Sequence, residues 1–153
     1  MIPELANLST SEAETVLKSP ILCCILIAGA DNEIDQKEIK KAIALSQKKM
    51  KRTSSRLQQF YQMLGEDFED KFKIILQEYP VEITQREPLL ISDLSALNAI
   101  IPKLDRSFAK EFYASLLEIT NEIAKSSGGV LGVGKIGPEE ARYVQLPMIK
   151  SPV

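Results

Sequence analysis

The sequence predicts an all-α protein of about seven helices joined by short connections, in a single domain over residues 1–153. Three observations lead to this fold class. Apolar residues recur at intervals of three and four, the period of a helix with one buried face. Helix-capping residues and prolines separate these stretches. No stretch alternates apolar and polar residues between hairpin turns, as a strand would.

The first two predicted helices are joined by a short acidic segment. Ser19-Pro20 predicts an N-cap and a first-turn proline, which would begin a buried apolar helix ending near Ala30. Asp35 and Glu38 are spaced as a capping box for the next helix, which we expect to end near Met50.

Two further helices are expected in the middle of the chain. Thr53 or Ser54 would cap a helix with one apolar face, made of Leu57, Phe60, Tyr61 and Leu64. Gly65 interrupts the pattern. The apolar stripe then resumes and continues up to Pro80, through Phe68, Phe72, Ile75, Leu76 and Tyr79.

The last third of the chain predicts two long helices and a glycine-rich connector. Residues 84–87 form a second capping box, and an apolar helix over residues 89–101 would end at Pro102. Asp105 would cap a long helix with Phe108, Phe112, Leu116, Ile119 and Ile123 on one face. Residues 128–137 would then connect to a final short helix that begins at Pro138.

The glycine-rich connector matches two phosphate-binding patterns, but its context excludes both. Residues 132–137 fit G-x-G-x-x-G and residues 129–135 fit G-x-x-x-x-G-K. Each motif requires a preceding strand, whereas a helix is predicted here. The P-loop also needs Ser or Thr after its lysine, and this chain has Ile136. We therefore expect no nucleotide binding.

The composition narrows the possible functions. The net charge is −2, so no broad basic face is expected and nucleic acid is not a predicted partner. The chain has no histidine, which excludes His-dependent nucleophiles and zinc sites with histidine ligands. We predict that the protein is not an enzyme.

Cys23 and Cys24 are adjacent within the apolar run over residues 21–30. Neighbouring helix positions point about 100° apart, so the pair is poorly placed to bond or to share a metal. Buried, reduced thiols in a cytoplasmic protein are the expectation. The run is half the length of a membrane-spanning helix and no signal peptide is evident, so no membrane insertion is expected.

The acidic segment is the part of the sequence that most suggests a function. Asp31, Glu33, Asp35 and Glu38 lie within eight positions, and their mutual repulsion must be offset by a cation, a basic side chain or N–H groups. Oxygen ligands without His or Cys favour a hard divalent cation, calcium or magnesium. An EF-hand is excluded, because its first ligands would be Ile27 and Gly29.

A faint internal repeat adds one more candidate ligand. Aligning Ile136 with Ile34 places Glu140 on Glu38, which suggests two related helical halves over about residues 1–80 and 81–153. If the halves pack face to face, Glu140 joins the carboxylates of the first half. The candidate metal ligands are therefore Asp31, Asp35, Glu38 and Glu140.

The segment Asp31-Asn32-Glu33-Ile34-Asp35-Gln36-Lys37-Glu38 resembles a motif of the tellurite-resistance TerB-like family, Asp-Gly-x-Ile/Val-x-x-x-Glu. Asn32 replaces the glycine and tolerates the same left-handed backbone. The match covers about residues 22–42, with Asp31 and Glu38 as the motif acids. The resemblance implies a helical domain of two halves that binds divalent metal, linked to tellurite resistance and stress response without a known reaction.

The same residues also have a purely structural interpretation. Asp35 and Glu38 would cap a helix, Asp31 would cap the preceding turn, and Glu33 would be solvated. The corresponding alternative function is a metal-free helical protein-interaction module, with a groove between its halves. The sequence leaves open the partner and the oligomeric state.

Overall fold

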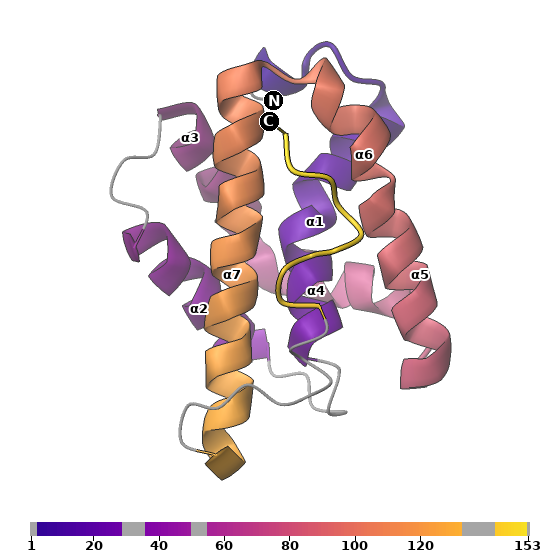
Figure 1. The fold of residues 1–153 in the computed structure, drawn as a ribbon, viewed down its shortest axis with the longest axis vertical. Coiled ribbons are helices and arrows are strands. Elements are labelled where there is room, and N and C mark those ends of the chain that lie inside the picture. Colours follow the sequence, from indigo (N-terminus) through magenta and orange to yellow (C-terminus); the bar gives the residue numbers. More distant parts are fainter. Residues whose placement is uncertain (1–2, 29–35, 50–54, 133–142, 153) are drawn as a thin grey trace.

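Helices α1 (Thr10–Ala28) and α7 (Arg106–Gly132) lie side by side in parallel at the centre of an all-α domain (Figure 1). This computed structural model describes residues 3–28, 36–49, 55–132 and 143–152, which form no strand. The other elements are α2 (Gln36–Lys49), α3 (Ser55–Gly65), α4 (Phe68–Gln77), α5 (Ile83–Ser95), α6 (Leu97–Ile100) and the 3-10 turns η1 (Pro3–Leu5) and η3 (Ile101–Lys103). The prediction of an all-α domain is confirmed, and six of the described helices have ten residues or more.

The first helix begins ten residues earlier than the sequence predicted, at Thr10 instead of Pro20. Its start is a capping box at Ser9 and Glu12, which the sequence-based assignment missed. The Ser9 backbone N–H donates to Glu12 Oε1 at 3.0 Å, and the Glu12 N–H donates to Ser9 Oγ at 3.1 Å. Pro20, expected in the first turn, lies inside α1.

The helix continues through Pro20 because a neighbouring side chain replaces the missing hydrogen bond. Proline has no N–H, so the Val16 carbonyl loses its usual donor four residues later. The Ser19 hydroxyl donates to that carbonyl at 2.8 Å, and Ser19 is fully buried. A buried carbonyl without a donor would be costly, so Ser19 makes Pro20 compatible with the helix.

The predicted apolar faces of the middle and long helices are confirmed. Among the predicted residues of α3, α4 and α7, all are buried except Leu76, which is half-buried. The expected cap of α7 is present, since the Phe108 N–H donates to Asp105 Oδ2 at 3.1 Å. The ends of α2 also match the prediction, and its residues Ile39, Ala42 and Ile43 are buried.

Two other helix boundaries were predicted wrongly. Helix α5 begins at Ile83, before the predicted capping box at residues 84–87, and ends at Ser95 instead of continuing to residue 101. Pro102 lies within η3, after which the backbone becomes extended at Leu104. The predicted capping box at residues 84–87 and the proline at residue 102 therefore do not set the start and the end of α5.

The long helix continues into the predicted glycine-rich connector as far as Gly132. Each glycine weakens a helix by about 1 kcal/mol, but extending an existing helix needs no new nucleation. Because a helix precedes and includes Gly129 and Gly132, neither phosphate motif follows a strand. The predicted final helix at Pro138 lies outside the described residues.

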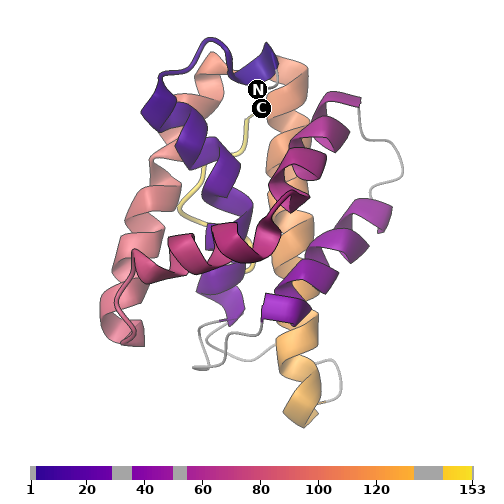
Figure 2. The ribbon, with the colours of Figure 1, turned by 180° about the vertical axis from the view of Figure 1, so that it is seen from behind.

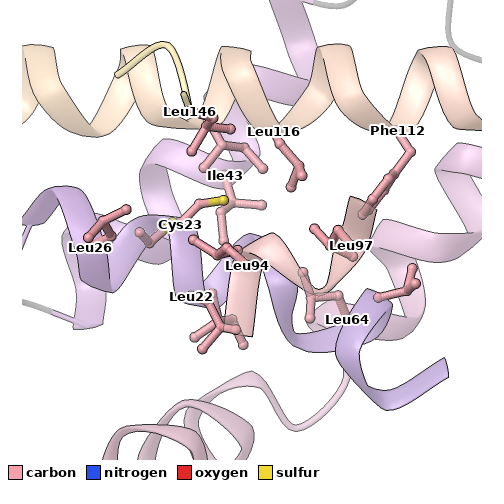
Figure 3. Packing of buried hydrophobic residues seen from close by; sticks show 14 of the residues in the cluster. Leu22, Cys23, Leu26, Ile43, Leu64, Leu94, Leu97, Phe112, Leu116 and Leu146 are labelled. Carbon is pink, nitrogen blue, oxygen red and sulfur yellow. The ribbon is translucent and has the colours of Figure 1, made fainter. Parts of the chain in front are cut away.

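One hydrophobic core joins helices from both predicted halves of the chain (Figure 3). Leu22, Cys23 and Leu26 of α1 meet residues of α2, α5 and α7 within it. Three of its phenylalanines are in contact with one another: Phe60 of α3 packs edge-on against Phe112 at 5.6 Å between ring centroids and against Phe108 at 6.4 Å.

Residues 143–152 run without helix across the face between α7 and α5 (Figure 1). Val144, Leu146 and Ile149 are buried in the core. The Thr120 hydroxyl donates to the Val144 carbonyl at 2.8 Å. Asn98 binds the backbone at two points, donating to the Met148 carbonyl at 2.9 Å and accepting from the Lys150 N–H at 2.7 Å.

The role of Ser19 can be tested by replacing it with alanine. We expect Ser19→Ala to lower the free energy of unfolding by about 1–2 kcal/mol, because the Val16 carbonyl would be buried without a donor. In a Pro20→Ala background the same change should cost much less, since the residue 20 N–H would again reach that carbonyl. Urea unfolding of the four proteins of this cycle measures the coupling.

Thr15→Ala is the matched control. The Thr15 hydroxyl donates to the Ser11 carbonyl at 3.1 Å at an exposed position, where water can replace it. This change should alter stability by no more than about 0.5 kcal/mol. Equal costs of Ser19→Ala with and without Pro20 would show that Ser19 does not compensate for the proline.

Candidate functional site

The four predicted metal ligands lie at or beyond the edges of the described helices. Asp31, Asp35 and Glu140 are outside the described residues. Glu38 lies on the first turn of α2, and its side chain is also outside the described part. The predicted grouping of the four carboxylates therefore stays a prediction.

The helices that flank these residues end or begin toward the same end of the molecule. Helices α1 and α7 end, and α2 begins, toward the lower end in Figures 1 and 2. Tyr143, three residues after Glu140, donates a hydrogen bond to Glu87 near the start of α5, at the same end. The acidic segment and the segment that contains Glu140 are thus both joined to elements at this end.

The described part of the chain holds no alternative metal centre. Among the side chains that the structure describes, no three Cys, Asp or Glu residues are grouped to hold a metal ion. Any cation site built from three or more such side chains would therefore have to include a side chain outside the described part, such as that of Glu38. The acidic segment is the densest group of carboxylates there.

The two cysteines are buried and free, as predicted. Both are completely buried on α1, and Figure 3 shows Cys23 among aliphatic side chains. Burial raises the pKa of the Cys23 thiol and that of the Cys24 thiol, because the apolar surroundings disfavour a thiolate. Both therefore remain protonated at neutral pH, which is unsuitable for nucleophilic or metal-binding chemistry.

A buried hydroxyl pair lies between α3 and α7. The Tyr61 hydroxyl and Ser115 Oγ are 2.6 Å apart, and Ser115 donates to the Phe112 carbonyl at 2.6 Å. Tyr61 is therefore the donor to Ser115. Burial also raises the pKa of Tyr61, so this pair stays neutral and serves packing.

A groove of about 390 Å³ lies between α1, α3 and α4. Figure 2 shows α4 crossing α1 on this face, with α3 ending beside the crossing. The groove has an apolar part and a charged margin. The apolar residues are Leu17, Ile21, Met63, Leu64 and Ile75, and the charged residues are Glu14, Lys18, Lys71 and Glu78. Small-molecule sites have this size and this mixture of surfaces.

The residues of this groove were not predicted from the sequence to form a site. Leu64 and Ile75 were predicted only as core residues, and the charged residues of α1 and α4 attracted no prediction. Leu17 and Ile21 are four residues apart, and Lys71, Ile75 and Glu78 are spaced by four and three. This spacing indicates that the residues of each set lie on one side of the chain, which is the part of the groove that the sequence could have shown. The hollow itself depends on how α4 crosses α1.

Comparisons with protein-family models, with curated proteins and with solved structures find no match for this chain. The resemblance to TerB-like proteins therefore rests on the acidic segment and its flanking helices. No described helix is long and apolar enough to cross a membrane.

The buried thiols predict a loss of stability at alkaline pH. Their pKa values are raised in the folded state, whereas an unfolded thiol has a pKa near 8.5. Their contribution is therefore fully present below about pH 8.5 and decreases as pH rises above it. We expect the free energy of unfolding to fall by about 2 kcal/mol per thiol between pH 8 and 10, measured by urea unfolding with a reductant.

A Cys23→Ala/Cys24→Ala variant isolates this effect. Its unfolding free energy should depend much less on pH over the same interval, because lysines and tyrosines titrate equally in both proteins. Parallel pH profiles for the two proteins would contradict the assignment of the alkaline loss to the thiols.

Proposed function

We propose that this chain is a non-enzymatic helical protein that binds a divalent cation at its acidic segment. The ligands would be Asp31, Asp35 and Glu38, with Glu140 supplied by the second half. The observation that carries the proposal is that α1 and α7 end, and α2 begins, toward the same end of the molecule. This arrangement supports a shared site, because the described helix ends next to the four acids all lie toward that end of the molecule.

The helix dipoles favour a cation at this end. Helices α1 and α7 are parallel, so both direct their C-termini toward it, and each C-terminus carries a partial negative charge. The carboxylates of the acidic segment add full negative charges. Only the start of α2 among these three helix ends contributes positive potential. A bound cation would relieve this concentration of like charge.

The chemistry of the ligands favours calcium or magnesium. Carboxylate oxygens are hard ligands, and the chain has no histidine to attract zinc or copper. The resemblance to TerB-like proteins extends the proposal to a role in stress response, including tellurite resistance. No catalytic step is proposed.

A metal-free helical interaction module is the second candidate function. Helix α2 begins at Gln36, directly after Asp35, which is where an N-cap residue belongs. Helix capping alone would then account for Asp35 and Glu38. The groove between α1, α3 and α4 also favours a binding module, because it offers apolar surface to a ligand.

Thermal unfolding of chelator-stripped protein tests the cation proposal. Calcium, magnesium, manganese or zinc would be added at millimolar concentration. A cation present at about a hundred times its Kd should stabilise the fold by about 2.7 kcal/mol. That corresponds to a rise in Tm of several degrees for a domain of this size.

An Asp31→Asn/Glu38→Gln variant should lose this rise while remaining folded. Glu66→Gln/Glu69→Gln is the matched control, since it removes two exposed carboxylates, one just after α3 and one in the first turn of α4. The control should keep the full response. An unchanged response of the Asp31/Glu38 variant, or no rise with any of the four cations, would refute the proposal and favour the metal-free module.

A further inference from the structure

We propose that the groove between α1, α3 and α4 binds a small amphipathic carboxylate, with its apolar chain along the floor and its carboxylate against Lys71. The residues of α1 that line the groove lie between Glu14 and Ile21, away from the C-terminal end of that helix at Ala28. The inference is therefore independent of the cation at the acidic segment.

The floor of the groove is suited to an aliphatic chain. Ile21, Leu64 and Ile75 are buried beneath it, and Leu17 and Met63 are half-buried at its sides. None of these five side chains carries a polar group. A methylene chain lying over them would remove apolar surface of both partners from water, which is favourable.

The two lysines at the margin differ in their partners. Lys18 Nζ is 3.5 Å from Glu78 Oε2, so its charge is already balanced by a carboxylate. Lys71 Nζ donates to the Met63 carbonyl at 2.6 Å, and no carboxylate of the described residues lies within 4.0 Å of it. Lys71 is therefore the cation that a ligand anion would meet.

Lys71 is also held in place for this contact. Its bond to Met63 in the last turn of α3 uses one of the three ammonium protons and leaves two for a ligand. The side chain is half-buried, so less water screens its charge than on an open surface. Glu14 and Glu78 elsewhere on the margin would disfavour an anion at those points.

The length of the groove favours a short chain over a partner helix. Glu78, the C-cap residue of α4, lies seven residues after Lys71, which corresponds to about 10 Å along the helix axis. An extended chain of roughly eight carbons spans that distance at standard bond lengths. A docked helix of three turns would need about 16 Å. A medium-chain fatty acid matches both the charge and the length.

Calorimetric titration of the full chain with hexanoate, octanoate, decanoate and dodecanoate, in the presence of chelator, tests the proposal. We expect affinity to increase about threefold to fourfold per methylene up to eight to ten carbons and then to level off. Absence of saturable binding across the series would overturn the proposal. A continued increase through dodecanoate would also overturn it, because it indicates non-specific partition.

Variants of Lys71 test the position of the carboxylate. Lys71→Gln should weaken octanoate binding by about fivefold to tenfold and leave the binding of 1-octanol unchanged, whereas Lys71→Arg should keep octanoate affinity. Lys73→Gln is the matched control, since Lys73 is exposed on the same helix outside the groove and should not affect binding. Equal octanoate affinity for Lys71→Gln and the unmodified chain would refute the role of Lys71.

A groove-filling variant provides a second test that does not depend on Lys71. Leu17→Trp adds bulk at the half-buried side of the groove and should abolish binding of both octanoate and 1-octanol. Leu89→Trp on α5, at an exposed position outside the groove, should leave both unchanged. Retained octanoate binding by the Leu17 variant would place the ligand elsewhere and overturn the proposal.

Discussion

Burial of the second half of α1 is the constraint on which the rest of the structure depends. Its last eight residues, from Ile21 to Ala28, are all buried and apolar, on every side of the helix. A helix that is apolar all round must be covered on all sides. Helix α7 covers it along its length, with α5 beside it and α4 crossing behind (Figures 1 and 2). Ser19 and Pro20 lie where α1 enters this environment, which is why the Val16 carbonyl needs a donor from within the helix.

The two proposed functions use different parts of this central helix. Its C-terminal end leads into the acidic segment, at the end of the molecule where α7 also ends. Its middle, from Glu14 to Ile21, lines the groove with α3 and α4. The core between them has fully buried thiols and a neutral Tyr61–Ser115 pair, so it contributes stability and no reactive group. A rigid α1 would hold both sites at fixed positions, although they act independently.

Much of the fold could be predicted because helical periodicity is a local property. The residues predicted on the buried faces of α3 and α7 are buried, and Asp105 caps α7 as expected. Boundaries were less predictable. Ser19-Pro20 has the local pattern of a helix start, but burial of the surrounding segment allows the helix to continue through it. The true start, at Ser9 and Glu12, had an equally local signal that was overlooked.

The sequence by itself determined the all-α class, the buried faces and the concentration of carboxylates between α1 and α2, because each follows from residues close together in the chain. Only the tertiary structure decided that Pro20 lies inside a helix, that residues 143–152 cross between α7 and α5, and that a groove forms between α1, α3 and α4. The path of residues 143–152 and the groove depend on contacts between residues far apart in the sequence, and the continuation of the helix through Pro20 depends on the burial of the segment around it together with the Ser19 hydrogen bond. The groove in particular exists only because α4 crosses α1 at an angle that leaves Leu17 and Met63 half-covered, and no local pattern specifies that angle.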